Sequence, residues 1–337
     1  MIAIAYHADL KEVQSDAALA ALLSPDVQHA PFDRLAWWQG LAEHCGLHPL
    51  LAVARAGDDA MVLPLQRADG RLSGLANWYS FRLRPVASPG ADAPALMAAL
   101  ARDLARRAPR VALSGLPGED GSADLVEAAF RKAGWIALRE PCDTNHVLPL
   151  RGRSYEEYLA GRPGPLRTTL KRKAGKVETR ILTAFDAEAW ADYEGIYAES
   201  WKPSEGSPAF LRAFARAEAA AGRLRLGIAY AWGRAIAAQM WTVEGGTAFI
   251  HKLAHREAAR PLSPGTVLSA ALFRHVIDED KAALVDFGTG DDGYKRDWME
   301  EVRPRYRLDL LRPAAPANWP FLARHAFKRL ARAGNHV

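Results

Sequence analysis

The sequence predicts an α/β protein made of two similar halves, in which strands and helices alternate along the chain. Three observations carry this prediction. The chain has 337 residues, a length that suits two domains. Its hydrophobic share of 49% and its charged share of 25% are those of a globular protein with a sizeable core. A Ser-Pro-Gly triplet, then a helical segment and a short strand ending in glycine, occurs at 88–90 and again at 263–265.

The first half is predicted over residues 1–152. Helical periodicity over 31–46 ends at a glycine, and the apolar runs 50–55 and 60–67, joined by an Ala-Gly-Asp-Asp turn, predict a hairpin. The other features follow in chain order as an aromatic run at 76–85, a helix at 93–107, a strand at 110–114, a helix at 123–133 and a strand at 135–139.

The second half is predicted over 153–315 and is followed by a basic helical tail over 316–337. Two helical pieces divided by glycines and prolines open it within 154–176. Its other predicted elements are helices at 186–201 and 208–221, strands at 223–231, 235–243 and 248–254, a helix at 266–277 and a strand at 283–287. Duplication of one α/β unit is the simplest account of the two halves, and a chance match of short patterns is the alternative.

Charge and cysteine content restrict the classes of function. Cys45 and Cys142 are too few for a disulfide framework or a four-ligand zinc site, so no metal is expected. No basic start leads into an apolar run, and no apolar stretch approaches the roughly 20 residues that span a bilayer, so we expect a cytoplasmic protein. A net charge of +5 suits an anionic ligand such as a phosphorylated cofactor, a nucleotide-sugar or a polysaccharide, and it also suits nucleic acid.

The loop 260–266 is the most informative segment, because it follows a predicted strand and opens a predicted helix. Unpaired backbone N–H groups and the positive end of the helix dipole suit a phosphate or pyrophosphate there. Gly265 allows close approach of the backbone. The residues predicted to form this seat are Leu262, Ser263, Pro264, Gly265 and Thr266. An ordinary helix start, capped by Ser263 or Thr266, is the alternative.

Charged residues gather where the strand 283–287 ends. Asp286 lies among apolar neighbours, so its carboxylate needs a partner or an open strand end. Asp291, Tyr294 and Lys295 follow in the loop just beyond, where open α/β sheets commonly gather ligand groups. We predict that this cluster borders a reaction centre. A structural ion pair between Asp286 and Lys295 is the alternative.

Two further pairs of residues are candidates for the site. His251 and Lys252 alternate on one strand and so face opposite sides. His251 suits proton transfer near neutral pH, and Lys252 suits an anionic donor or acceptor group. Trp201 and Lys202 enter a loop and suit a sugar or nucleotide-sugar acceptor. A surface or core role is the alternative for each of the four.

Two basic segments have competing interpretations. We interpret 167–176 as a solvated helix face, and binding of phosphates or polyanions is the alternative. The tail 318–336 carries Trp319, Phe321, Leu322, Phe327 and Leu330 beside arginines and lysines. We interpret it as a helix packed on its own domain, and peripheral contact with a membrane surface is the alternative.

A resemblance to a known family rests on AAQMWTVEGGTAFIHKLAHREAARPLSPGTVLSAALF and on VDFGTGDDGYKRDW. The matching features are the strand pair, His-Lys-Leu-Ala on its second strand, the Ser-Pro-Gly-Thr helix start and the Asp-Phe-Gly-x-Gly-Asp-x-x-Tyr-Lys end. They resemble the CelD-type branch of the GNAT acetyltransferases, named for cellulose biosynthesis. That branch is similar to the Fem-type peptidoglycan aminoacyltransferases. The resemblance covers 154 to about 313 well and 31–150 more faintly.

The resemblance implies tandem GNAT-like halves, each a mixed central sheet flanked by helices, with a degenerate first half and a catalytic second half. It implies acetyl-CoA or another acyl-CoA as donor, with the pyrophosphate at 262–266. An amine or hydroxyl of a sugar, amino acid or polysaccharide precursor then attacks the thioester directly. Ser-Pro-Gly-Thr replaces the Gly-x-Gly/Ala ending of many simple acetyltransferases. This departure weakens the case for CoA as the donor and leaves the case for acyl transfer unchanged.

The predicted site therefore has three groups of residues. Those expected to carry catalysis are Asp286, Lys295, His251 and Tyr294. Those expected to bind the acceptor are Trp201, Lys202, Lys252 and Asp291. The donor is expected at 262–266.

Two other functions stay open. A Fem-like enzyme takes its aminoacyl group from tRNA, which is the only case in which we expect a nucleic-acid partner. A non-catalytic module would bind a polymer on the same scaffold. Thiol release from acyl-CoA distinguishes an enzyme from such a module.

Overall fold

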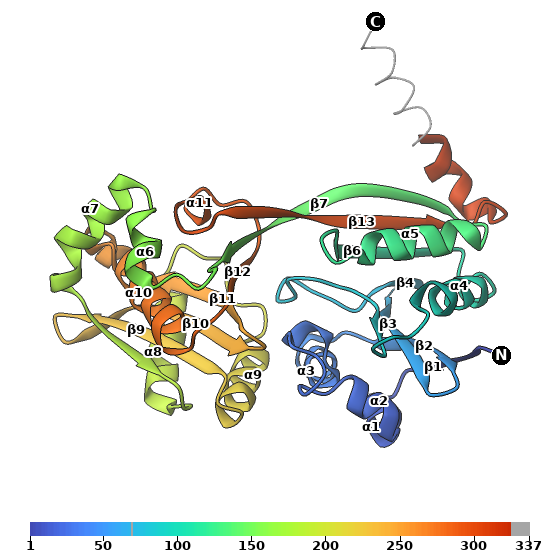
Figure 1. The fold of residues 1–337 in the computed structure, drawn as a ribbon, viewed down its shortest axis with the longest axis horizontal. Coiled ribbons are helices and arrows are strands. Elements are labelled where there is room, and N and C mark those ends of the chain that lie inside the picture. The colour runs from blue at the N-terminus through green and yellow to red at the C-terminus, as the bar shows by residue number, and fades with distance from the viewer. Residues whose placement is uncertain (69, 325–337) are drawn as a thin grey trace, which may run out of the picture.

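The computed structural model describes residues 1–68 and 70–324, and these residues confirm the predicted α/β fold of two similar halves (Figure 1). The strands of the first half are β1 (Ala3–His7), β2 (Pro49–Ala56), β3 (Asp59–Ala68), β4 (Arg71–Gly74), β5 (Val86–Ala87), β6 (Arg110–Pro117) and β7 (Ile136–Pro149). Its helices are α1 (Leu10–Ser15), α2 (Ala17–Leu22), α3 (Leu35–Cys45), α4 (Ala93–Leu104) and α5 (Ser122–Lys132), with a 3-10 turn η1 (Pro31–Asp33).

The second half repeats this alternation of helices and strands. Its strands are β8 (Glu178–Leu182), β9 (Leu224–Ala231), β10 (Arg234–Glu244), β11 (Thr247–His255), β12 (Leu284–Thr289) and β13 (Glu301–Leu311). Its α-helices are α6 (Tyr155–Ala160), α7 (Gly164–Lys173), α8 (Ala187–Ala198), α9 (Pro208–Ala220), α10 (Pro264–Arg274) and α11 (Lys295–Trp298). Short helical turns are η2 (Ala174–Lys176), η3 (Glu257–Leu262), the π turn η4 (His275–Glu279) and η5 (Pro316–Asn318).

One mixed sheet runs through both halves in the order β1-β2-β3-β4-β6-β13-β7-β12-β11-β10-β9-β8. The predicted repeat lies at corresponding places in it. The triplet at 88–90 leads through α4 into β6, which pairs in parallel with β4. The triplet at 263–265 leads through α10 into β12, which pairs in parallel with β11. Each half thus contains a parallel strand pair connected across a helix.

The last strand of each half pairs with the other half. β13 lies antiparallel to β6 of the first half, and β7 lies antiparallel to β12 of the second half. β7 and β13 also pair with each other along eleven residues of β13, and they run side by side between the two halves in Figure 1. The sheet therefore crosses the predicted boundary near residue 152, and β13, inside the range predicted for the second half, completes the sheet of the first.

Several predicted elements are confirmed. The two strands β2 and β3 form the expected hairpin, and Gly46 ends α3 in the left-handed conformation with φ 68°. Helix α10 begins at Pro264, because proline is well suited to the first turn of a helix. The capping box of Ser154 and Glu157 starts α6.

Other elements differ from the prediction. β7 continues to Pro149, ten residues past the predicted strand at 135–139, and β13 was not predicted. Both strands are rich in polar residues, and hydrogen bonding to each other holds them in the extended state. The aromatic run 76–85 forms a loop and contains no strand. It reaches from the first half to the second.

Side chains of the second-half strands alternate between two cores, as the two-residue period of a strand requires. Leu226 and Ile228 of β9 face a core that they share with α3 of the first half and with α8 and α9. Ala229 and Ala231 face a second core with α10. The first core contains Trp37 of α3, whose ring lies 5.0 Å from that of Phe210 on α9. Apolar packing therefore joins the two halves beneath the sheet.

The predicted tail lies only partly within the described residues. Trp319 is exposed and its indole donates to Pro313 O, and Arg110 stacks on the ring of Phe321 at 4.3 Å. Phe327 and Leu330 and the arginines and lysines around them lie outside the described residues. Among residues 1–68 and 70–324, no helix is long and apolar enough to cross a membrane.

Candidate active site

Strands β11 and β12 pair in parallel over a short stretch and then separate. The last pair is Phe249 with Asp286, although β11 continues to His255 and β12 to Thr289. The space between them holds a cavity of about 170 Å³, which we call the gap cavity. Its walls come from both strands, from the loop after β12 and from Trp78 and Phe81 of the first half.

The gap cavity brings together five residues that were predicted from the sequence. They are Lys202, His251, Lys252, Tyr294 and Lys295. The prediction that His251 and Lys252 face opposite sides was wrong, because the β10–β11 register shifts between Met240 and Trp241 and breaks the regular alternation at His251. Asp286, Asp291 and Trp201 do not line the gap cavity. The residues 262–266 do not line it either and lie at the start of α10.

Lys252 lies at the inner end of the gap cavity in a cage of opposite charge and aromatic rings. Its ammonium is 3.0 Å from the Glu205 carboxylate and lies over the rings of Tyr79, at 4.6 Å, and Tyr197, at 5.4 Å. Burial lowers the pKa of Lys252, and the negative charge of Glu205 opposes that change. The Glu205 carboxylate also accepts a hydrogen bond from the Tyr79 hydroxyl at 2.5 Å.

Lys295 and Tyr294 close the other side of the gap cavity. The Lys295 ammonium donates to Thr289 O at 2.5 Å, and its side chain is almost fully buried. Burial lowers the pKa of Lys295, since the charged form loses water there. Burial also raises the pKa of Tyr294, whose ring meets Phe287 edge to face at 5.8 Å. Lys295 is thus a buried ammonium held at the end of β12.

Asp286 points away from the gap cavity into a buried hydrogen-bond network. Its Oδ1 accepts from Asn145 Nδ2 at 2.6 Å and from the Gly288 N–H at 2.8 Å. Arg305 of β13 donates to Asn145 Oδ1 at 2.7 Å and forms an ion pair with Glu119. The structure contains no Asp286–Lys295 ion pair among its described residues. The Asp286 carboxylate instead fixes the point where β12 leaves β11 and joins β7.

His251 is enclosed by aromatic rings. Its ring lies 5.1 Å from that of Phe214 and 5.4 Å from that of Phe81, and its Nε2 is 2.8 Å from the Thr242 hydroxyl. Burial, aided by the nearby Lys252 charge, lowers the pKa of His251 to about 3. The imidazole is therefore neutral at physiological pH, and it is a much weaker base than the sequence suggested.

The start of α10 leaves backbone donors open. Ser263 is its N-cap residue, with φ 53°, and makes no side-chain cap hydrogen bond, so the capped helix start that was the alternative for this loop is not formed by Ser263. Pro264 has no N–H, which leaves the N–H groups of Gly265 and Thr266 to meet a ligand. Lys173 of α7 donates to Pro261 O at 2.8 Å and brings a cation to this loop.

Trp201 and Asp291 lie near the site but outside its cavity. The Trp201 ring lies 4.3 Å from that of His255, which a Cβ added at Gly265 would meet at 3.5 Å, so Trp201 borders the start of α10. Asp291 is half exposed and bonds to Arg296 at 2.7 Å and to His146 at 3.0 Å. Hydrogen bonds from Arg296 and His146 lower the pKa of Asp291. Asp291 thus forms a surface ion pair beside the site.

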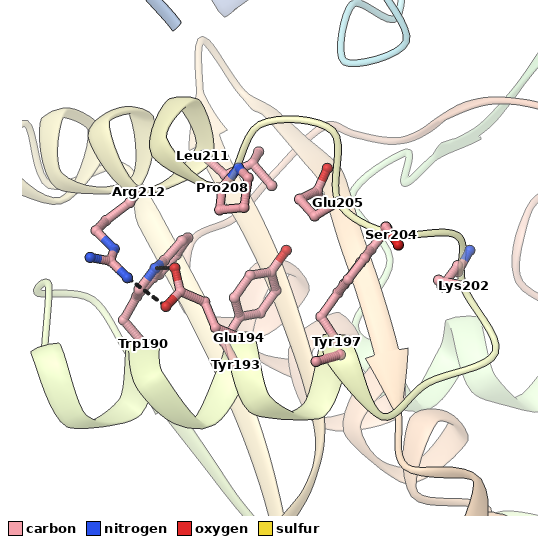
Figure 2. A pocket seen from close by; sticks show the side chains of 11 residues that line it. Trp190, Tyr193, Glu194, Tyr197, Lys202, Ser204, Glu205, Pro208, Leu211 and Arg212 are labelled. Carbon is pink, nitrogen blue, oxygen red and sulfur yellow. Dashed lines mark hydrogen bonds and ion pairs between the residues drawn. The ribbon is translucent and has the colours of Figure 1, made fainter. Parts of the chain in front are cut away.

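A second cavity, of about 460 Å³, lies between α8, the loop 200–207 and the start of α9 (Figure 2). We call it the helix cavity. Its lining residues are Trp190, Tyr193, Glu194, Tyr197, Ala198, Lys202, Ser204, Glu205, Pro208, Leu211 and Arg212. Tyr197 and Lys202 also line the gap cavity, so the two cavities adjoin.

The sequence-based prediction missed Glu205 and the aromatic residues around it. Tyr193 and Tyr197 lie on one face of a predicted helix, a spacing that equally indicates an ordinary core. Tyr79 was seen only as part of an aromatic run, and its contact with Glu205 joins residues 126 apart in the chain. No local pattern could have found that contact.

Among the described residues, no group of three or more His, Cys, Asp or Glu side chains is arranged to hold a metal ion. Residues 165–296 match the family model described as an acetyltransferase (GNAT) domain. Part of the second half is thus similar to a GNAT acetyltransferase domain. The match spans α8, α9, β9 to β12 and α10, which form most of the walls of both cavities. Such a domain supports acyltransferase activity in general, whereas the CelD-type branch stays a prediction.

Solved structures with a similar fold cover nearly the whole chain. FemX is 10% identical over 92% of this chain and 98% of its own, with a TM-score of 0.61. A tandem GNAT protein from the clavulanic acid biosynthesis pathway is 15% identical, over 94% of this chain and 100% of its own, with a TM-score of 0.55. L-PGS from Bacillus licheniformis is 12% identical, over 81% and 86%, with a TM-score of 0.50. No curated protein matches the sequence. At these identities the likeness concerns the fold, which is that of a tandem GNAT protein.

Proposed function

We propose that this chain transfers an acyl group from an activated donor, with acyl-CoA as the first candidate, to an amine or hydroxyl of a small acceptor. The observation that carries the proposal is the gap cavity, where β11 and β12 separate beside the start of α10. Three lysines, Lys202, Lys252 and Lys295, line this small cavity. Lys295 is buried and the other two are partly buried, and such a concentration of ammonium groups suits a carbonyl oxygen on which negative charge develops.

The start of α10 suits the phosphate end of an acyl-CoA donor. The open N–H groups at the start of α10, and the nearby Lys173, favour a pyrophosphate. The acyl end of the donor then enters the gap cavity, and Trp201 on His255 borders the path between them.

In the reaction, the acceptor nitrogen attacks the acyl carbon, a C–N bond forms and the bond from carbon to the leaving sulfur or oxygen breaks. The proton lost by the amine passes to a carboxylate, which then gives it to the departing sulfur or oxygen. We assign this role to Glu205, which lines the helix cavity and contacts Lys252. Positioned acid–base groups of this kind typically supply about 10²–10⁴-fold.

The other predicted catalytic residues have supporting roles in this proposal. Lys295 and Tyr294 face the acyl carbonyl from the end of β12. Asp286 holds the strand end through Asn145 and the Gly288 backbone. His251 is a neutral, aromatic-lined part of the cavity wall, which keeps water from the acyl group.

Free thiol released from acetyl-CoA in the presence of a panel of amines and hydroxyl compounds tests the proposal. We expect release that depends on the acceptor, and a loss of at least tenfold in Lys295→Met. Lys132→Met is the matched control, because Lys132 is an exposed lysine on α5 of the first half. Equal thiol release with and without every acceptor would overturn acyl transfer and favour a non-catalytic module.

The donor seat has a separate test in the binding of CoA by calorimetry. Gly265→Val introduces a branched side chain at the start of α10, where its Cβ would meet the His255 ring at 3.5 Å, and should weaken CoA binding by obstructing the approach to the open N–H groups. Gly164→Val, at the start of helix α7, is the matched control because a Cβ there meets no atom within 4 Å. Unchanged CoA affinity in Gly265→Val would reject this seat.

A second candidate function has one observation in its favour. The cations Arg167, Lys171, Arg172 and Lys176 are exposed on α7 and η2, and within the described part of the chain they form no ion pair. Lys173 links this surface to the start of α10. A donor attached to nucleic acid, such as an aminoacyl-tRNA, would contact this surface. Competition between tRNA and CoA, measured at several salt concentrations, distinguishes the two donors.

A further inference from the structure

The helix cavity has the size and position of an acceptor site. Its 460 Å³ falls within the roughly 300–1,000 Å³ of small-molecule pockets. It meets the gap cavity at Tyr197 and Lys202, and the contact between Glu205 and Lys252 lies at that junction. A molecule in the helix cavity therefore presents one end to the point where the acyl group is proposed to lie.

One wall of the helix cavity is aromatic. Trp190, Tyr193 and Tyr197 lie three and four residues apart on α8, so their rings share one face of the helix. Figure 2 shows these rings side by side along α8, facing the loop and the start of α9. The rings of Trp190 and Tyr193 are 4.7 Å apart. Such a wall binds the flat C–H face of a ring and also attracts an ammonium.

The two carboxylates of the helix cavity, Glu194 and Glu205, already have partners, and the Lys202 ammonium lies over the Trp201 ring at 5.4 Å. Glu194 accepts hydrogen bonds from Arg212 at 2.5 Å and from the Trp190 indole at 2.9 Å. Glu205 is paired with Lys252. An anionic ligand would face these two carboxylates, whereas the hydroxyl and amine groups of a sugar can bond to the lone pairs that the two ion pairs leave free.

The Tyr193 hydroxyl is buried without a hydrogen-bond partner among the described residues. Burial raises the pKa of Tyr193 well above its ordinary value, so the hydroxyl stays protonated and is a donor. An unmade hydrogen bond of a buried hydroxyl destabilises the folded protein. A phenylalanine would avoid this penalty, and the hydroxyl therefore indicates a group that a ligand completes.

We propose that the helix cavity binds the acceptor and that the acceptor is an amino sugar, a hydroxylated ring of monosaccharide size that carries an amine. The ring packs on the α8 aromatic wall, a ring hydroxyl accepts from Tyr193, and the amine points to Glu205. This inference rests on the proposed acyl transfer. The amine nitrogen forms the C–N bond, the thioester C–S bond of the donor breaks, and Glu205 takes the proton from nitrogen and passes it to the departing thiolate, which leaves as the thiol.

Calorimetry without any donor tests the site, with glucosamine, glucose and lysine as probes. We expect glucosamine to bind more tightly than glucose, and lysine not to bind. Tyr193→Phe should weaken glucosamine binding roughly tenfold, because one hydrogen bond to the ligand is lost. The same variant should be as stable as the parent chain or more stable, because its ring lacks the unpartnered hydroxyl.

Tyr158→Phe is the matched control. Its hydroxyl is also buried but donates to Trp298 O at 2.9 Å, away from both cavities. Its removal should lower the melting temperature and leave glucosamine binding unchanged. Opposite effects on stability and on binding in the two variants distinguish a ligand-binding hydroxyl from a structural one.

Ala198→Trp provides a second variant, because Ala198 is exposed at the rim of the helix cavity and a larger side chain there fills the cavity without disturbing the core. It should abolish glucosamine binding and leave CoA binding unchanged. Equal glucosamine affinity in Ala198→Trp and the parent chain, or in Tyr193→Phe and the parent chain, would overturn the site. Binding of lysine in place of glucosamine would overturn the ligand class. Specific glucosamine binding without thiol release would instead contradict the proposed acyl transfer.

Discussion

Asp286 lies where β12 leaves β11, and its carboxylate accepts hydrogen bonds from Asn145 and from the Gly288 backbone. Both donors are buried, and both bond to the same oxygen, Oδ1. The hydrogen bonds of Asp286 therefore have a structural role, and substitutions can distinguish this role from the effect of its negative charge.

Asp286→Ala should lower the free energy of unfolding by about 1–3 kcal/mol, because two buried donors lose their acceptor. Asp286→Asn should retain most of that stability, since its amide oxygen can accept the same two hydrogen bonds. Chemical denaturation of both variants measures the difference. Equal destabilisation by the two substitutions would mean that the negative charge, and not the hydrogen bonds, holds the strand end.

His251 makes stability depend on pH. The pKa of His251 is about 3 in the folded protein, below its ordinary value of 6.5. As pH falls below about 6.5, the unfolded chain binds a proton that the folded chain does not, so the free energy of unfolding should decrease by about 1.4 kcal/mol per pH unit toward pH 3. Above pH 6.5 His251 is neutral in both the folded and the unfolded chain, so this loss of stability is absent.

His251→Gln should remove this slope, which unfolding free energies between pH 7 and pH 5 will measure. His48→Gln is the control, because His48 is exposed. A slope that persists unchanged in His251→Gln would show that other groups carry the pH dependence.

At the scale of elements, the loop 76–85 of the first half completes the site of the second. Trp78 and Phe81 line the gap cavity, and the Tyr79 hydroxyl accepts from the Ser207 N–H at 2.8 Å. Trp78 also lies against Gly206, where an added Cβ would come within 2.2 Å of the indole ring. The corresponding connection in the second half is short, because β11 leads directly through η3 into α10.

Gly206→Ala should displace Trp78 and lower turnover with acetyl-CoA and an amine. Trp78→Ala should also lower turnover, and adding Gly206→Ala to it should have little further effect, because the clash is then gone. A double-mutant cycle on turnover measures this coupling. Additive losses would mean that Gly206 acts through the loop 200–207 itself and not through Trp78.

At the scale of the whole molecule, a buried ion cluster joins the halves. Arg34 precedes α3 of the first half, lies 3.4 Å from Glu218 on α9 and contacts Glu244 at the end of β10. These three side chains are 4–6% exposed. Burial lowers the pKa of Arg34, and the charge of Glu218 opposes that effect. The cluster lies beside the apolar packing of Trp37 on Phe210.

Arg34→Met should destabilise the chain by about 3–5 kcal/mol, because it leaves the buried Glu244 carboxylate without a counter-charge, whereas Glu218 keeps its ion pair with Arg223. Arg234→Met, which removes an exposed partner of Glu199, is the control and should change stability by less than about 1 kcal/mol. Thermal and chemical denaturation measure both. A small effect of Arg34→Met would show that apolar packing and the β7–β13 strands alone hold the halves together.

Local patterns in the sequence predicted many of the elements of this protein. Periodicity and turn residues predicted the hairpin β2–β3, the helices α4, α5 and α10 and the polar cluster after β12, because hydrogen bonds within helices and tight turns join residues close in the chain. The repeated Ser-Pro-Gly triplet also predicted that one unit occurs twice.

Which strands pair and which side chains contact one another could be seen only in the tertiary structure. β7 and β13 are polar strands whose extended state depends on each other and on partners in the opposite half. The cage of Lys252 joins Glu205, 47 residues away, to Tyr79, 126 residues before Glu205. The burial that lowers the pKa of His251 likewise arises from packing between distant segments. So does the hydrogen bond from Asn145, which holds the Asp286 carboxylate away from the gap cavity. Local sequence patterns carry no record of such long-range contacts, because the residues involved meet only after both halves have folded against each other.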